Sequence, residues 1–229
     1  MEHLVKIKSI EHVTHDVLRI VTEKPPSLSF KPGQAADISI NKVNWQTEKR
    51  PFTFTSLPNY TYLEFTIKTY PSRKGVTNEL LKLKKHDELI VADVFGDIAY
   101  KGKGVFIAGG AGVTPFISIF RDLHAKNEIG DNKLLFANKT KADIILEQEF
   151  KNTLGKNFIN ILSDEKVEGY AHGFITVDLL RAHVTTDASG RAGIGRNVYV
   201  CGPPPMMEAI EKQLADLKVD QKLIIKEAF

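Results

Sequence analysis

The feature that most constrains the fold of this chain is a change of rhythm near Gly102. Before it, short segments rich in β-branched residues are separated by Pro, Gly, Asn and Asp; after it, strand and helix patterns alternate. Closely spaced strands are typical of a small antiparallel barrel, and alternation is typical of a parallel sheet covered on both faces. The sequence therefore predicts two domains, an antiparallel β-barrel over residues 1–100 and an α/β domain over residues 101–229.

The expected elements follow from these patterns. In the first domain, strands are predicted at Leu4–Ile7, Val17–Val21, Ala36–Ile40, Tyr62–Ile67 and Glu88–Val91, with a helix at Thr77–Leu83. In the second domain, strands are predicted at Val105–Ala108, Lys133–Asn138, Phe158–Leu162, Asn197–Cys201 and Leu223–Lys226. The helices between them are expected at Pro115–Ala125, Asp143–Lys151, Thr176–Ala182 and Pro205–Leu217, and a surface loop at Thr185–Arg196.

Composition excludes several classes of protein. Apolar residues make up 42% of the 229 residues and charged residues 26%, as in ordinary globular domains. The net charge of +3 is spread along the chain, which is weak support for nucleic-acid binding. The most apolar window, Val105–Phe120, is broken by glycines and shorter than the ~20 residues that span a bilayer. We expect no nucleic acid, no membrane and, because no signal-peptide pattern opens the chain, no export.

The chain contains a single cysteine, Cys201. One thiol cannot close a disulfide within the chain, hold an iron–sulfur cluster or complete a thiolate zinc site. The sequence therefore predicts no metal site and indicates a reducing, cytoplasmic location.

A glycine-rich turn, Gly109-Gly110-Ala111-Gly112-Val113-Thr114-Pro115, stands between a buried-strand pattern and a helix. Glycines let the backbone approach a ligand, and a helix N-terminus favours a pyrophosphate. The spacing differs from the common G-x-G-x-x-G fingerprint. A turn that merely packs strand on helix would look the same, so both interpretations stay open here.

A second turn, Cys201-Gly202-Pro203, follows another strand of the same predicted sheet. Ligands of open parallel sheets bind beyond the carboxyl ends of the strands, so both turns are expected to face one crevice. A buried structural thiol is the plainer interpretation of Cys201.

The barrel carries a third group of residues. Arg50-Pro51-Phe52-Thr53 is followed by Ile67-Lys68-Thr69-Tyr70 and then by Gly75-Val76-Thr77 at a helix start. An arginine, a hydroxyl and a helix N-terminus suit an anion, and aromatic side chains suit a flat ring. The alternative is an exposed arginine on a strand next to a capped helix.

In this order, the motifs resemble the ferredoxin-NADP reductase superfamily. Arg50-x-Phe52-Thr53, Gly75-x-Thr77, Gly110-x-Gly112-Val113-Thr114-Pro115 and Cys201-Gly202-Pro203 are similar to that family's motifs, and so is Phe30-Lys31-Pro32-Gly33-Gln34. The resemblance covers nearly the whole chain. It implies that the barrel binds FAD, that the α/β domain binds NADH or NADPH, and that hydride passes from nicotinamide C4 to flavin N5.

The resemblance also implies residue roles. Arg50 would pair with the flavin pyrophosphate, Thr53 would hydrogen-bond near N5, and Phe52 replaces a tyrosine that is usual in the family. The other implied FAD contacts are Ile67, Lys68, Tyr70, Gly75, Val76, Thr77 and Phe229. Gly110, Gly112, Thr114, Gly202 and Pro203 would approach the dinucleotide, with Cys201 near the nicotinamide. Thr53, Cys201 and Glu227 are the implied catalytic residues; Glu227 would assist proton movement, and Phe229 would cover the flavin.

The choice of dinucleotide can be argued from charge. NADPH-using members of the family commonly have Ser-Arg where this chain has Ser163-Asp164. A carboxylate repels a 2'-phosphate and accepts hydrogen bonds from free ribose hydroxyls, which favours NADH. Lys139 and Lys141 offer positive charge that would suit NADPH.

The predicted function is that of an FAD-dependent NAD(P)H oxidoreductase of the ferredoxin or flavodoxin reductase type. Because the chain cannot hold an iron–sulfur cluster, its electron acceptor is expected to be separate: a ferredoxin, a flavodoxin, an oxygenase component or a small quinone-like compound. Two alternatives remain at this stage. One is a flavin-binding regulatory or sensory module without turnover; the other is an oligonucleotide-binding barrel joined to an unrelated α/β domain.

Overall fold

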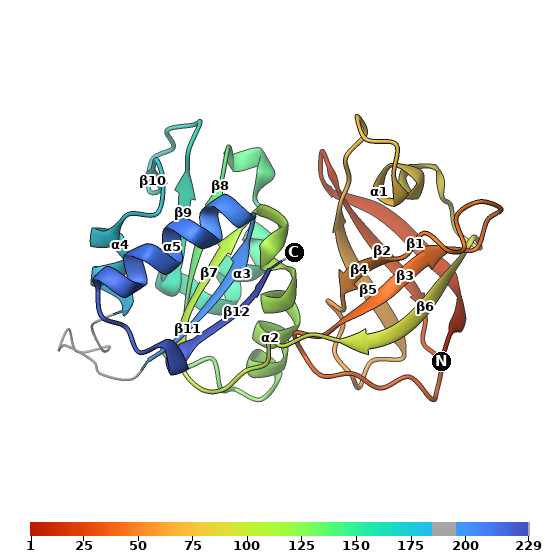
Figure 1. Ribbon diagram of the computed structural model, residues 1–229, viewed down its shortest axis with the longest axis horizontal. Helices are drawn as coiled ribbons and strands as arrows, with labels where there is room; N and C mark the ends of the chain where they lie inside the picture. The colour runs from red at the N-terminus through yellow and green to blue at the C-terminus, as the bar shows by residue number, and fades with distance from the viewer. Residues whose placement is uncertain (185–195, 229) are drawn as a thin grey trace. The chain divides into compact units, whose positions relative to one another are not determined.

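The computed structural model describes residues 1–184 and 196–228, with side chains described as far as Glu227 (Figure 1). Its contacts divide the chain into two compact units. The first comprises residues 1–99 and 114–122, and the second comprises residues 100–113 and 123–229. Most of the helix that follows the glycine-rich turn, residues 114–122, therefore packs with the barrel.

The first unit is an antiparallel barrel of six strands in the order β4-β3-β6-β1-β2-β5. Its strands are β1 (His3–Thr14), β2 (Val17–Glu23), β3 (Ala35–Ile40), β4 (Arg50–Thr53), β5 (Tyr62–Lys68) and β6 (Glu88–Phe95). A bridge between Phe54 and Phe65 joins the end of β4 to β5 and closes the barrel. The predicted antiparallel β-barrel is confirmed.

Alternating residues of these strands fill the barrel. Ile7, Leu18, Ile20 and Ile38 are at most 2% exposed, as expected where one face of a strand turns inward. The Phe54 ring stacks on Phe30 at 4.1 Å between ring centroids. The predicted helix at Thr77–Leu83 is present as one α-helical turn, α1 (Val76–Glu79), and a 3₁₀ turn, η1 (Leu80–Lys82).

The second unit contains a parallel sheet of six strands in the order β10-β9-β8-β7-β11-β12. The strands are β7 (Gly104–Gly109), β8 (Lys133–Asn138), β9 (Phe158–Leu162), β10 (Ala171–His172), β11 (Asn197–Gly202) and β12 (Ile224–Ala228). The helices are α2 (Thr114–Ala125), α3 (Glu147–Leu154), α4 (Val177–Val184) and α5 (Pro204–Asp216). Short 3₁₀ turns are η2 (Gly110–Val113), η3 (Lys141–Asp143), η4 (Gly155–Asn157) and η5 (Gln221–Leu223). The predicted parallel sheet is confirmed.

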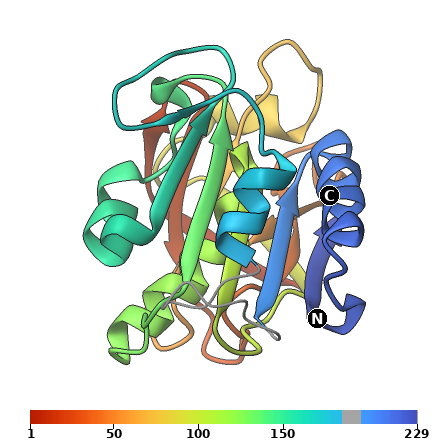
Figure 2. The same cartoon turned by 90° about the vertical axis from the view of Figure 1, so that its left-hand side faces the viewer.

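Helices cover both faces of this sheet. On one face, Leu180 of α4 and Ile210 of α5 share a buried cluster with Val105 and Val200 of the sheet (Figure 2). On the other face, Phe150 of α3 meets Phe136 of β8 at 6.3 Å between ring centroids. Buried from both sides, the strands are almost continuously apolar, as is typical of parallel sheets.

Some elements differ from the prediction. The helix expected from Asp143 begins at Glu147, because Thr140 and Asp143 form a capping box around the short turn η3 and Leu146 adopts a positive φ of 52°. Strands β4 and β10 were not predicted as strands. The loop expected at 185–196 lies outside the described residues except for Arg196. No helix in the described part of the chain is long and apolar enough to cross a membrane.

Candidate functional site

Two glycines of the glycine-rich turn, Gly110 and Gly112, differ in their surroundings. A Cβ on Gly112 would lie 2.3 Å from the Cys201 carbonyl oxygen and 2.6 Å from Gly202 Cα, so this glycine lets two turns pack backbone to backbone. Gly110 has a φ of +51°, and no heavy atom of the described residues lies within 4 Å of a Cβ placed there. The turn therefore serves packing at Gly112 and leaves open backbone surface at Gly110.

The turn that ends β11 lies beside this one. Cys201 pairs with Ala108 of β7 on one side and with Glu227 of β12 on the other. Its side chain is fully buried, and burial, followed by the negative charge of Glu227, raises the pKa of the Cys201 thiol. The thiol is therefore neutral at physiological pH. A neutral thiol is better suited to packing against a ligand as a small polarizable group than to acting as an acid or a nucleophile.

The predicted discriminating pair, Ser163 and Asp164, directly follows β9. The Ser163 hydroxyl donates a hydrogen bond of 2.6 Å to the Asp164 carboxylate. The Ser163 N–H donates to the Asn138 carbonyl at 3.0 Å, and the Asp164 N–H donates to the Lys139 carbonyl at 2.9 Å. These bonds hold the ends of β8 and β9 together, so the carboxyl edge of the sheet carries Asp164, Gly110 and Cys201 in strand order.

In the barrel, Arg50 lies on strand β4 with an exposed side chain. Its guanidinium donates to the Lys49 carbonyl at 2.6 Å and lies 3.4 Å from a carboxylate oxygen of Glu48. Phe52 is partly buried against the barrel core, and Thr53 is buried. The Thr114 hydroxyl, at the start of α2 in the same unit, lies 3.4 Å from the Thr53 hydroxyl.

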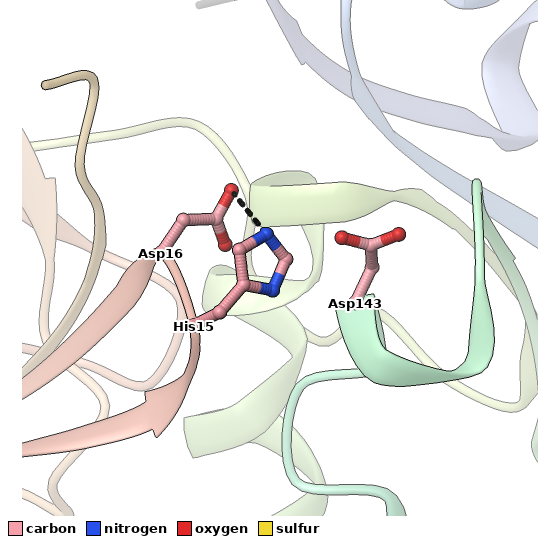
Figure 3. A group of neighbouring side chains, drawn as sticks. All are labelled: His15, Asp16 and Asp143. Carbon is pink, nitrogen blue, oxygen red and sulfur yellow. Dashed lines mark ion pairs between the residues drawn. The ribbon is translucent and has the colours of Figure 1, made fainter.

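The end of β5 is fastened to the turn between β1 and β2. Lys68 Nζ lies 2.7 Å from Asp16 Oδ2, and the Thr69 N–H and hydroxyl both donate to the Asp16 carbonyl. Burial acts to raise the pKa of Asp16, but the hydrogen bond and charge of Lys68 outweigh it and lower the pKa. His15 Nε2 lies 3.7 Å from the same carboxylate (Figure 3).

Asp143, also labelled in Figure 3, belongs to the second unit, where it accepts hydrogen bonds from the Thr140 backbone and hydroxyl at 2.8 and 2.7 Å. This carboxylate is accounted for by the capping box at the start of η3.

The remaining barrel residues border open surface. Ile67 is buried, whereas Tyr70 is 38% exposed and has the Arg73 guanidinium 4.8 Å from its ring centroid. Gly75 caps α1, which begins Val76-Thr77, and no heavy atom of the described residues lies within 4 Å of a Cβ at Gly75. Glu227 is partly buried on β12, and Phe229 lies outside the described residues.

Sequence reasoning missed a buried carboxylate of the barrel. Glu64 on β5 is 1% exposed. Its Oε1 accepts from Arg121 Nη1 at 2.5 Å and from the Thr55 hydroxyl at 2.9 Å, and its Oε2 accepts from Arg19 Nε at 2.8 Å. Burial acts to raise the pKa of Glu64, but the two arginines, Arg121 first, lower it. The available signal was a glutamate between Leu63 and Phe65, inside a strand that is mostly apolar.

Comparisons with known proteins place the chain in a family. Residues 3–136 match the model of an FAD-binding domain, and residues 106–212 match the model of an oxidoreductase NAD-binding domain. The fold and these matches define a two-domain protein with an FAD-binding domain and an oxidoreductase NAD-binding domain. The chain belongs to the ferredoxin-NADP reductase superfamily.

Several relatives are similar over most of the chain. It is 29% identical over 224 residues to NADH-cytochrome b5 reductase 2 of Mycosarcoma maydis, covering 89% of this chain and 62% of that protein. It is 31% identical over 221 residues to the reductase component of propane 2-monooxygenase of Mycolicibacterium goodii, covering 89% of this chain and 61% of that protein. The chain thus spans about three fifths of the length of these relatives.

A solved structure shows the same fold. The CS-b5R domains of human Ncb5or, in their NAD+ form, superpose with a TM-score of 0.83 at 26% identity. The match covers 99% of this chain and 69% of that one.

Proposed function

We propose that this protein is an FAD-dependent NAD(P)H oxidoreductase that passes electrons from a nicotinamide dinucleotide through flavin to a separate acceptor protein. The observation that carries the proposal is the meeting of two glycine-bearing turns at one edge of the parallel sheet, with open backbone surface at Gly110 and the Cys201 thiol beside it. The identity of the two cofactors is inferred from the FAD-binding and NAD-binding family models that match the chain. Residues 1–100 would form the FAD domain and residues 101–229 the NAD(P) domain.

The barrel residues fit a flavin. Arg50 would turn from the carbonyl of Lys49 to the pyrophosphate, a change that an exposed side chain makes easily, because it breaks only surface contacts. The open surface at Gly75 and the N–H groups of Val76 and Thr77 would receive the same phosphates. Phe52 and Tyr70 would pack on the ring, beside Ile67, and Lys68 and Thr53 would hydrogen-bond to it.

The second unit fits a dinucleotide. Gly110, whose backbone surface is open, would receive the pyrophosphate, and Gly112 and Thr114 would approach it from the same turn and the start of α2. Gly202 and Pro203 would contact the nicotinamide half, with Cys201 as a neutral wall. When both cofactors are bound, they supply hydride transfer and the release of electrons singly or in pairs.

The remaining roles concern protons and access. Glu227 would assist proton movement, and its register places it beside Cys201. Phe229 would cover the flavin until nicotinamide displaces it.

NADH is proposed as the preferred donor. Asp164 already accepts a hydrogen bond from Ser163, and the same carboxylate would accept hydrogen bonds from the ribose hydroxyls of NADH. A 2'-phosphate at that position would meet negative charge instead.

The acceptor is proposed to be an electron carrier or an oxygenase component. Support comes from the propane 2-monooxygenase relative, which is named as a reductase component, and from the cytochrome b5 reductase relative.

The test is an anaerobic titration of the purified, flavin-loaded protein with NADH and, separately, with NADPH. The absorbance of the flavin is monitored throughout each titration. Bleaching by NADH at a rate well above that with NADPH is the expected result. Flavin that stays oxidised with both nucleotides would reject the reductase and leave a sensory flavin module. Faster bleaching by NADPH would overturn only the role given to Asp164 and would leave the proposed reductase activity in place.

A further inference from the structure

Two asparagines of the parallel sheet have buried side-chain atoms without hydrogen-bond partners. Asn138 on β8 is 9% exposed, and Asn160 on β9 is 4% exposed. In the described part of the chain, both amide atoms of Asn138 and the Oδ1 of Asn160 lack a partner. Buried polar atoms are nearly always hydrogen-bonded, so each exception calls for an explanation.

The two side chains share one face of the sheet but differ in depth. Phe136 pairs with Asn160, and side chains two residues apart on a strand point the same way, so Asn138, Phe136 and Asn160 face the side covered by α3. Asn138 is the last residue of β8, at the edge where the candidate site lies. Asn160 is in the middle of β9, two residues before that edge.

The neighbours of Asn138 along the edge are already candidate ligand residues. On one side, its carbonyl accepts the Ser163 N–H at 3.0 Å, which ties it to the turn that carries Asp164. On the other side, the preceding residue, Ala137, pairs with Gly109 at the start of the glycine-rich turn. Asn138 therefore stands between the residue proposed for the adenosine ribose and the turn proposed for the pyrophosphate.

We propose that the side-chain amide of Asn138 binds the adenosine half of the dinucleotide, where ribose joins phosphate. This inference rests on the proposed function and adds a specific residue to it. Because both amide atoms are buried in the structure, the side chain would turn toward the carboxyl edge on binding. Its two N–H donors and its acceptor oxygen would then match a phosphate oxygen and a ribose hydroxyl. The nicotinamide half is assigned to the far side of β7, next to Cys201, because the carboxyl edge runs β9, β8, β7, β11.

The competing explanation is structural. An ordered water between α3 and the sheet would satisfy Asn138 and Asn160 alike, because such waters commonly pair with buried polar atoms. Asn160 is therefore the matched control, since it has the same residue type, the same sheet face and the same lack of a partner, but lies away from the edge.

The experiment measures binding of ADP-ribose and of nicotinamide mononucleotide to the flavin-loaded protein by calorimetry. Asn138→Leu is expected to weaken ADP-ribose binding about tenfold or more, because the ligand loses its hydrogen bonds. Binding of nicotinamide mononucleotide should not change. The thermal midpoint should stay or rise, since leucine has a similar volume and leaves no polar atom unpaired. Asn160→Leu should have the same thermal effect and normal ADP-ribose binding.

The outcomes separate the two proposals. Unchanged ADP-ribose affinity in Asn138→Leu, while NADH still bleaches the wild-type flavin, overturns the role of Asn138 and leaves the reductase. An equal loss in Asn160→Leu also overturns it, in favour of a general effect on the sheet. A wild-type protein that binds neither ADP-ribose nor NADH contradicts both proposals. If the leucine variant does not fold, Asn138→Ala is subjected to the same measurements.

Discussion

The buried Glu64 of the barrel and two buried asparagines of the parallel sheet differ in how their polar atoms are paired. In the barrel, the buried Glu64 carboxylate has both oxygens occupied, by Arg121 and Thr55 on one side and by Arg19 on the other. In the parallel sheet, the buried amides of Asn138 and Asn160 have atoms with no partner among the described residues. Glu64 is thus a fully paired buried charge, whereas the two asparagines are neutral groups that are partly unpaired.

We infer from this difference that Glu64 stabilises the fold, whereas the unpaired amide of Asn138 is available to a ligand. A paired buried charge stabilises only as long as every partner stays, so Glu64 fixes β5, β2 and α2 to one another. An unpaired group gains a partner only from something outside the fold, and Asn138 lies where a ligand is expected.

Glu64→Ala should be the most destabilising of these changes. It leaves Arg19 and Arg121 without their shared buried partner, and breaking a buried pair in this way typically costs about 3–5 kcal/mol. The free energy of unfolding in urea measures this. Glu11→Ala is the control, because Glu11 is the exposed partner of Arg19, and exposed pairs contribute at most about 1 kcal/mol. Equal losses in the two variants would mean that burial does not determine how much the ion pairs of Arg19 stabilise the fold.

The stabilisation by Glu64 should depend on pH. Its folded-state pKa is depressed, because the two arginines outweigh burial, so its contribution is complete above the unfolded pKa of about 4.3 and disappears as the pH falls through the folded value. We expect the difference in unfolding free energy between wild type and Glu64→Gln to be constant from pH 7 to about pH 5 and to shrink below it. A difference that grows on acidification would show that Glu64 is not held ionised.

A structural feature of this protein could be predicted from the sequence only where the residues that determine it are close together along the chain. Strand β7 and its glycine-rich turn were predictable, because a buried run followed by glycines and a helix lies within a few residues. The start of α3 was not, since it depends on the left-handed backbone of Leu146. The pairing of Glu64 with Arg121 joins residues 57 positions apart, so no local pattern announces it.

The same limit applies to the candidate site. The motif residues of the sheet edge were expected together, because parallel strands end at one edge. The roles of Gly110 and Gly112 in the turn, one open and one packed, depend on the distance to Cys201 and could only be seen in three dimensions. Asn138 carried no motif that reasoning from a single sequence recognised, and only its burial without a partner drew attention to it.

Gly112→Ala should destabilise the protein by about 1–3 kcal/mol, because the added Cβ would overlap the Cys201 backbone and backbone must shift. Gly75→Ala is the matched change in the barrel, where φ is −146° and the added Cβ meets open space, so stability should hardly change. Thermal unfolding of both variants measures the effect. Calorimetric titration with ADP-ribose should show weaker binding for Gly112→Ala only. A stable Gly112→Ala protein with normal affinity would mean that the two turns are not held as closely as described.

Asp164→Arg should leave stability nearly unchanged and shift the choice of donor. Asp164 is exposed and its side chain interacts with the neighbouring Ser163 hydroxyl, so its loss removes little from the fold. An arginine there could pair with a 2'-phosphate, and one such contact, worth about 1.4 kcal/mol, would raise the NADPH-to-NADH ratio of kcat/KM about tenfold. Lys139→Ala serves as the control for general charge, because it changes the net charge of the same edge without touching the carboxylate. An unchanged ratio in Asp164→Arg would mean that the ribose hydroxyls bind elsewhere along the edge. A change of similar size in the NADPH-to-NADH ratio of Lys139→Ala would attribute the preference to the overall electrostatic potential of the site rather than to Asp164.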